Sequence, residues 1–210
     1  YLMMSGSSPS NFGGSAPSAD ILTEWFVILL FFSSPAITMR LLSDEARMGT
    51  LELLLTAPVR DFELVLGKWL GAFLFVFTLM AFTLIFPIIM NNYIEPGLDL
   101  KMLLSSYLGV ILVSAALIAM GVGISAMVTN QFAAYFITFG LFFFLWFLVG
   151  IPSFFLQKGG EVFKYLSINT HFFQSMNRGT INYGDIVYFL SLTALGLFIG
   201  TTAIEIRRWR

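Results

Sequence analysis

Three side chains could support acid–base or metal chemistry by type and spacing: Glu161, His171 and Asp185. An enzyme acting on lipids would need such carboxylate and imidazole groups close together. His171 is the single histidine and the chain has no cysteine, so thiol catalysis, disulfides and a His-rich metal site are excluded. Because His171 has no base, nucleophile or metal ligand near it in the sequence, we expect a structural role for it. A lipid-modifying enzyme is the least favoured alternative.

The glycine patterns do not form a nucleotide-binding loop. Gly67-Lys68 is similar to the end of a phosphate-binding loop, but that loop needs glycine and Ser/Thr where this chain has Phe62 and Trp69. Gly121-Val122-Gly123 begins a loose dinucleotide pattern inside an apolar stretch, with no strand before it. We therefore expect Gly121 to pack helices, and we expect no cofactor bound by this chain.

The charged segment 43–68 is far longer than a turn requires. Its charges alternate in sign, at Asp44, Glu45, Arg47, Glu52, Arg60, Asp61, Glu63 and Lys68. A short amphipathic helix over Glu45–Thr56 would place three leucines on one face, namely Leu51, Leu54 and Leu55. Pro58 would end this helix, and Asp61 can cap the next one. An ordinary solvated loop is the alternative, but we favour a docking element for a protein partner.

The composition indicates a membrane protein. Of 210 residues, 58% are hydrophobic and 11% charged, against about 45–50% and about 25% in soluble domains. No ionisable side chain occurs in 69–94, 102–157 or 186–204, and about 20 apolar residues cross a bilayer. This excludes an ordinary soluble enzyme and a disordered chain. The net charge of −1, without a basic patch, excludes a nucleic-acid-binding protein.

We predict an all-α polytopic membrane protein with five visible spans. They cover residues 21–42, 63–90, 102–128, 132–151 and 184–204. Pro35 should kink the first span and Pro87 should bend the second, and Thr129-Asn130-Gln131 should form the turn between the third and fourth. No span carries an ionisable residue at mid-depth, which argues against a proton- or sodium-coupled carrier.

The basic residues predict the orientation. Placing residues 40–68 and the C-terminus in the cytoplasm puts seven Lys and Arg residues there and four outside. Residues 1–19 are then an outer loop, residues 20–210 a transmembrane domain, and 152–183 an outer re-entrant or interfacial region rich in aromatics. Because the chain starts at Tyr1, we expect it to be a fragment whose N-terminus lies upstream. A missing upstream span would place that N-terminus in the cytoplasm.

Two further pairs of glycines lie four residues apart. Gly67 with Gly71, and Gly196 with Gly200, have the spacing that allows close contact between membrane helices. We expect packing within the domain, with a dimer seam as the alternative.

The segment 43–68 resembles the ABC-2 class of ATP-binding-cassette transporter permeases. The family pattern is approximately E-x-x-x-G-T-x-E-x-L-L-[ST]-x-P followed by G-K, and this chain supplies Glu45, Gly49, Thr50, Glu52, Leu54, Leu55, Thr56, Pro58 and Gly67-Lys68. The closest subgroup is the permeases associated with gliding motility, whose last span also runs into an Arg-Arg-Trp-Arg-like tail. The resemblance covers residues 20–210.

The resemblance implies a half-transporter with six spans, of which the first would be missing here. Two such domains, identical or different, would pair in the bacterial inner membrane. Each would dock on a separate nucleotide-binding subunit that binds ATP and Mg²⁺. The coupling helix would be residues 45–57.

Within that helix the resemblance also assigns roles. Ion pairs to the partner would come from Glu45, Arg47 and Glu52. Leu51, Leu54 and Leu55 would fill a groove in the partner, while Gly49 and Pro58 would shape the turn.

Two further expectations remain open. The same complex could be a non-transporting membrane anchor that transmits force to an auxiliary envelope subunit. If it transports, the absence of a charged pocket favours an apolar or amphipathic cargo.

Overall fold

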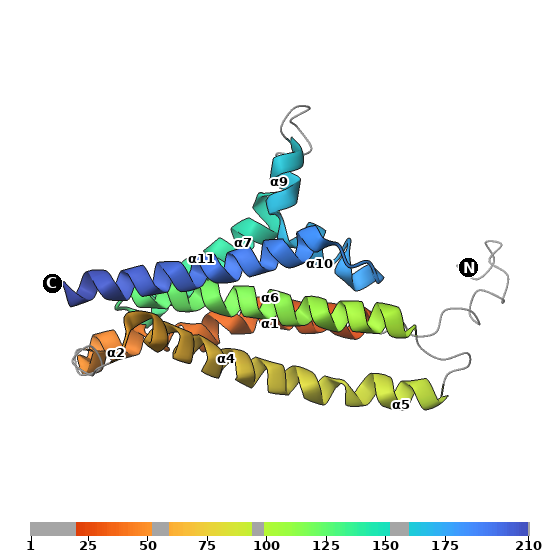
Figure 1. Ribbon diagram of the computed structural model, residues 1–210, viewed down its shortest axis with the longest axis horizontal. Coiled ribbons are helices and arrows are strands. Elements are labelled where there is room, and N and C mark those ends of the chain that lie inside the picture. The colour runs from red at the N-terminus through yellow and green to blue at the C-terminus, as the bar shows by residue number, and fades with distance from the viewer. Residues whose placement is uncertain (1–19, 52–58, 94–98, 152–159, 210) are drawn as a thin grey trace, which may run out of the picture.

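The computed structural model describes residues 20–51, 59–93, 99–151 and 160–209, and within these ranges the chain forms helices and no strands (Figure 1). The elements are α1 (Asp20–Thr38), α2 (Ser43–Met48), α4 (Asp61–Thr83), α5 (Ile85–Tyr93), α6 (Leu100–Met127), α7 (Gln131–Phe143), η2 (Phe144–Leu148), α9 (Gly160–Leu166), α10 (Ile168–Phe172), η3 (Met176–Arg178) and α11 (Tyr183–Arg208).

Among the described residues, five segments are long and apolar enough to cross a membrane, which confirms the predicted all-α polytopic fold. They are Leu22–Met48, Asp61–Ile89, Leu100–Met127, Gln131–Leu148 and Tyr183–Arg208. Each overlaps one predicted span. The predicted turn between the third and fourth spans is present as well, because Asn130 caps α7 by accepting a hydrogen bond from the Phe132 amide at 2.9 Å.

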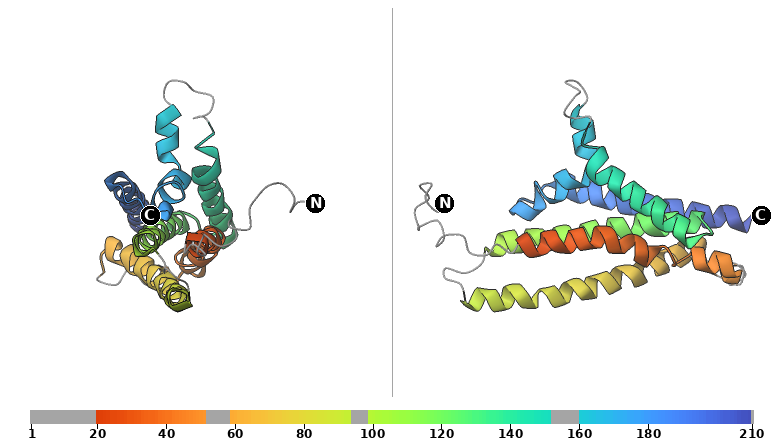
Figure 2. Two further views of the ribbon diagram at one scale, coloured as in Figure 1. Left: turned by 90° about the vertical axis from the view of Figure 1, so that its right-hand side faces the viewer. Right: turned by 180° about the vertical axis from the view of Figure 1, so that it is seen from behind.

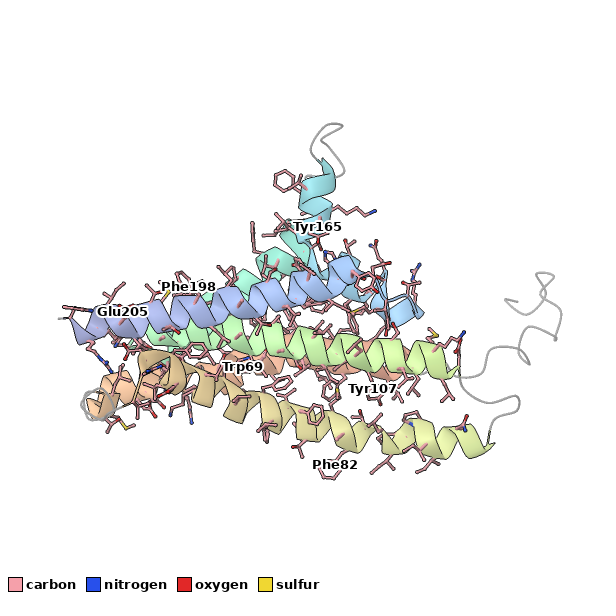
Figure 3. All side chains as sticks on the ribbon, in the orientation of Figure 1. Trp69, Phe82, Tyr107, Tyr165, Phe198 and Glu205 are labelled. Atoms are coloured by element: carbon pink, nitrogen blue, oxygen red, sulfur yellow. The ribbon has the colours of Figure 1, made fainter. Side chains whose placement is uncertain are left out.

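Helix α6 is the centre of the bundle. Its most apolar window is 83% buried, whereas no other span exceeds 44%. Seen end-on, α1, α4, α7 and α11 surround it (Figure 2). The outer faces of the surrounding helices carry large apolar side chains such as Phe82 and Phe198, which point away from the bundle as lipid-facing residues do (Figure 3).

The second span is interrupted close to where Pro87 predicts a bend. Helix α4 ends at Thr83 and α5 begins at Ile85. The proline ring removes an amide donor and crowds the carbonyl four residues earlier, which belongs to Thr83. Helix α1, in contrast, continues through Pro35 to Thr38 without interruption.

The bundle has two distinct ends. We call the charged segment 43–68 the insert. The end of the bundle that we call the insert end contains α2, the α6–α7 turn and the C-terminal end of α11 (Figure 1). We call residues 167–182 the cap, which includes α10 and η3 and lies at the other end. The predicted region 152–183 thus contains three short helices, α9, α10 and η3.

Candidate functional site

The insert end is built around Ser125, in the last turn of α6. Its hydroxyl oxygen accepts hydrogen bonds from the amides of Leu42 at 3.2 Å and Ser43 at 3.1 Å. The same hydroxyl donates a hydrogen bond to the Met39 carbonyl at 3.3 Å. Leu42 and Ser43 are fully buried. Because one side chain satisfies these buried backbone groups, the start of the insert is fixed to the central helix.

The structure interrupts the helix predicted over residues 45–56. Helix α2 ends at Met48, and Gly49 follows in the left-handed conformation with a φ of 73°. Glycine adopts this conformation without a steric penalty and commonly ends a helix. The chain turns helical again at Thr50, whose hydroxyl donates to the Glu45 carbonyl at 3.3 Å.

The leucine face of the insert is described only in part. Leu51 is 4% exposed and packs in this chain's own core. Glu52, Leu54, Leu55 and Pro58 lie outside the described residues, so the docking roles expected of them stay predictions.

The two charged residues expected at the docking surface have different surroundings. Glu45 forms an ion pair with Lys68 of α4, and both side chains are partly buried. This pair connects α2 to the second span. Arg47 is exposed, and the described part of the chain places no acidic partner on it. The exposed Arg47 thus differs from Glu45, which stabilises the insert itself.

A second ion pair joins the insert to the last span. The Arg208 guanidinium near the end of α11 lies 2.7 Å from Asp61, and it donates to the Val59 carbonyl at 3.3 Å. The predicted capping role of Asp61 is wrong, because the N-cap of α4 is Arg60. The Arg60 amide donates to Glu63 at 3.1 Å.

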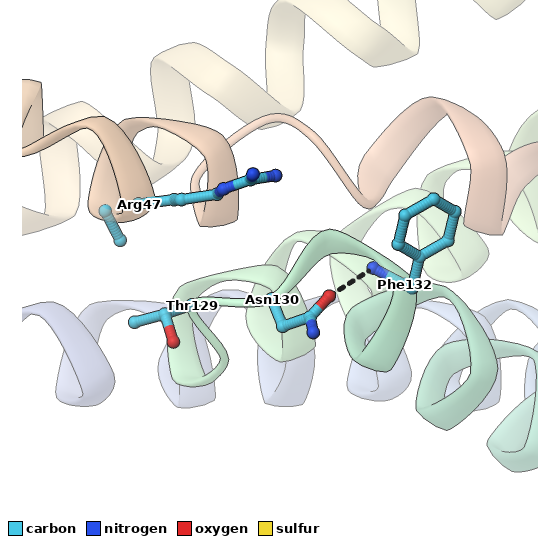
Figure 4. A pocket seen from close by; sticks show the side chains of 5 residues that line it. Arg47, Thr129, Asn130 and Phe132 are labelled. Atoms are coloured by element: carbon cyan, nitrogen blue, oxygen red, sulfur yellow. Dashed lines mark hydrogen bonds between the residues drawn. The ribbon is translucent and has the colours of Figure 1, made fainter.

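Two adjoining hollows open between α2 and the α6–α7 turn, and Arg47 lines both. Figure 4 shows side chains that line the larger one. The larger has a volume of about 590 Å³ and is lined by Ala46, Arg47, Thr129, Asn130 and Phe132. The smaller has a volume of about 450 Å³ and is lined by Arg40, Asp44, Arg47, Met48 and Gln131. We call both together the insert groove. Its lining is mostly polar, and it contains two arginines.

The predicted packing glycines fall into two groups. A Cβ on Gly196 would lie 2.4 Å from the Ala119 carbonyl carbon of α6, and one on Gly121 would lie 2.2 Å from the Thr38 hydroxyl of α1. A Cβ on Gly200 would meet Val65 of α4 at 3.0 Å. These three glycines allow close contact between spans. Gly67 and Gly71 have no described atom within 4 Å of such a Cβ, so the structure shows no close helix contact at that pair among the described residues.

The residues considered for catalysis lie at the cap end. His171 and Asp185 are buried, with Nδ1 and Oδ1 2.6 Å apart. The other ring nitrogen lies 2.6 Å from the Tyr165 carbonyl. Ser175 donates to the second oxygen of Asp185. Both histidine nitrogens are thus occupied by protein acceptors, an arrangement suited to holding the cap on α11.

Among the described residues, no three His, Asp or Glu side chains are grouped as a metal site. The side chain of Glu161 lies outside them.

Asn177 connects the cap to two spans and was not singled out from the sequence. It is 2% exposed, accepts a hydrogen bond from Thr23 at 2.8 Å and donates to Glu24 at 3.0 Å. Its backbone neighbour Met176 accepts from Ser105 of α6 at 2.7 Å. The cap therefore joins α1, α6 and α11, and Glu24 has a structural partner.

An apolar hollow of about 340 Å³ lies between α1, η2 and α10. Its lining residues are Ile28, Phe31, Phe32, Trp146, Phe147, Asn169 and Phe173. The Phe31 and Trp146 rings are 5.2 Å apart in an edge-to-face arrangement. Element η2 is a π-helical turn, and such turns often accompany functional sites in membrane and soluble helices.

Only some of these residues could be identified from sequence patterns. Ser125 is a hydroxyl in an apolar span, and such residues often bond to a neighbouring helix. The ion pair between Asp61 and Arg208 joins residues 147 positions apart, and no local pattern predicts it.

Comparisons with known proteins identify the family. Residues 15–164 match the profile described as ABC-2 family transporter protein. Searches of curated proteins and of solved structures found no significant match. The profile does not distinguish a gliding-motility subgroup, so that assignment stays a prediction. Since the matched segment includes four spans and the charged insert, the chain belongs to the ABC-2 family of transporter proteins, which are membrane permease components of ABC transporters.

Proposed function

We propose that this chain converts ATP hydrolysis by a separate nucleotide-binding subunit into movement of membrane spans. The subunit would bind ATP and Mg²⁺ and dock at the insert end. That end would lie on the cytoplasmic side of a bacterial inner membrane. A second permease domain, identical or different, would complete the transport path.

One feature carries this proposal: the insert is tied to several spans by specific contacts. Ser125 joins its start to α6, and Glu45 joins α2 to Lys68 of α4. Arg208, at the end of α11, pairs with Asp61, at the start of α4. A push on α2 would therefore reach α4, α6 and α11 together, and nucleotide binding could favour one of two packings of the bundle.

The apolar hollow beside η2 favours transport over a purely structural anchor. It is lined almost entirely by apolar and aromatic side chains, with Asn169 as the polar exception. Such a lining suits an apolar or amphipathic cargo. The proposed direction is export.

The experiment is to reconstitute the chain with its nucleotide-binding subunit in lipid vesicles and to measure ATP hydrolysis with and without the chain. We expect the chain to change the hydrolysis rate and an amphipathic cargo to change it further. Hydrolysis that is unaffected by the chain would contradict the proposal. Hydrolysis that responds to the chain, while no cargo moves, would favour the membrane-anchor alternative.

A further inference from the structure

The insert groove has an excess of positive charge. Arg40 and Arg47 line it, and Asp44 is the only acidic residue among its lining side chains. Both arginines are exposed. The described part of the chain gives neither of them an ion-pair partner.

This excess arises because neighbouring carboxylates are already used. Glu45 pairs with Lys68, Asp61 pairs with Arg208, and Glu63 accepts from the Arg60 amide. Of the described acidic residues in the insert, these three stabilise the chain internally. Among the described residues, Asp44 is the one carboxylate that lines the groove beside two arginines. Guanidinium groups bind carboxylates through paired hydrogen bonds, so the groove suits an external anion.

The rest of the lining also offers hydrogen-bond donors. The side-chain oxygen of Asn130 accepts from the Phe132 amide, so its NH₂ group remains as a donor. Thr129 and Gln131 lie on either side of it in the α6–α7 turn. Amide and hydroxyl groups next to arginines suit a peptide segment, which presents backbone carbonyls together with carboxylates.

We propose that the insert groove binds an acidic segment of the nucleotide-binding subunit through Arg40 and Arg47. The inference rests on the proposed function. It adds the α6–α7 turn to the docking surface, and it assigns the chemistry of the partner's contacting segment. Movement of the subunit would then act on α2 and on the end of α6 at the same time.

The test compares binding of the co-expressed nucleotide-binding subunit to full-length wild type and to the double variant Arg40→Gln/Arg47→Gln, in detergent at low and at raised salt. Lys101→Gln is the control: this exposed lysine lies in the first turn of α6, next to Met102, which adjoins Gly179 of the cap. We expect binding by the double variant to be about tenfold weaker or worse at low salt, and wild-type binding to weaken with salt. Soluble polyglutamate should compete with the subunit for wild type, whereas polyglutamine should not.

The outcomes separate this inference from the proposed function. If wild type and the double variant bind the subunit equally, the groove is not the acidic docking site, although the proposed function stands. If wild type binds no nucleotide-binding subunit, both fail. A double variant that keeps the subunit but loses binding to phosphatidylglycerol vesicles would overturn the inference in favour of a lipid headgroup. Thermal unfolding of each variant in detergent checks that the fold is retained.

Discussion

Asp61 and Arg208 join the first residue of α4 to the last residue of α11, with 2.7 Å between the charged atoms. The Arg208 side chain is 40% exposed, so the pair contributes at most about 1 kcal/mol to stability. The position of this pair matters more than its energy. The pair joins the insert to α11, and the other end of α11 carries Asp185, which contacts His171 of the cap.

The first prediction concerns this ion pair. Arg208→Gln should leave the melting temperature almost unchanged and reduce the effect of the chain on ATP hydrolysis by the partner. The swapped double variant Asp61→Arg/Arg208→Asp should restore part of that effect. If the swapped variant loses as much of the effect on ATP hydrolysis as Arg208→Gln does, the ion pair itself is not required.

The second prediction concerns Ser125. Ser125→Ala removes the acceptor for the buried amides of Leu42 and Ser43. An unsatisfied buried group costs about 1–3 kcal/mol, so we expect a clear fall in thermal stability in detergent. Ser191→Ala is the control, because that exposed hydroxyl bonds only within its own helix. Equal stability of the two variants would contradict the anchoring role of Ser125.

The third prediction compares two glycines in membrane-spanning helices, Gly196 in α11 and Gly71 in α4. Gly196→Ala places a Cβ 2.4 Å from the backbone of Ala119, so α11 must move away from α6. Gly71→Ala meets no described atom within 4 Å, and alanine favours a helix over glycine by about 1 kcal/mol. We expect the first variant to unfold at lower temperature and the second to match or exceed wild type.

A reversed order of these two melting temperatures would mean that the α6–α11 contact is looser than described. If Gly71→Ala instead disrupted an oligomer without lowering the stability of the single chain, that glycine would lie at a contact with a second chain.

The fourth prediction concerns the cap. His171→Ala removes a hydrogen-bond partner from the buried Asp185 carboxylate. A buried polar group left unsatisfied costs about 1–3 kcal/mol, and more when it is charged, so the variant should markedly destabilise the cap end. Lys164→Gln, an exposed substitution in α9, should have little effect. Hydrogen exchange of residues 167–182 measures the difference locally.

The same His171→Ala variant tests the lipid-enzyme alternative. We expect neither wild type nor the variant to release products from phospholipid vesicles. Lipid turnover by wild type that disappears in the variant would restore that alternative.

Much of the fold follows from the sequence because the bilayer imposes a length on every apolar span. The uncharged stretches 69–94, 102–157 and 186–204 predict the membrane helices directly. The helix predicted over residues 45–56 runs through Gly49, where the structure ends α2 at Met48. The resemblance assigned Gly49 to a turn, and glycine is a common stop signal after a helix. The leucine spacing favoured a continuous helix instead.

The candidate site was less predictable because its contacts join distant residues. Ser125 contacts Ser43 across 82 positions, and the insert groove forms only when α2 lies beside the α6–α7 turn. The resemblance directed attention to residues 45–57, but it did not reveal that Glu45 pairs with Lys68. Local patterns carry no information about such tertiary contacts.

The most direct measurement is to purify the full-length chain from its native membrane in mild detergent and to identify its partners by mass spectrometry. The account predicts a stoichiometric subunit with a phosphate-binding loop, and it predicts that this subunit is lost when the insert is replaced by a short polar linker. A chain that arrives alone, or only with other membrane proteins, and that does not respond to ATP would contradict the account.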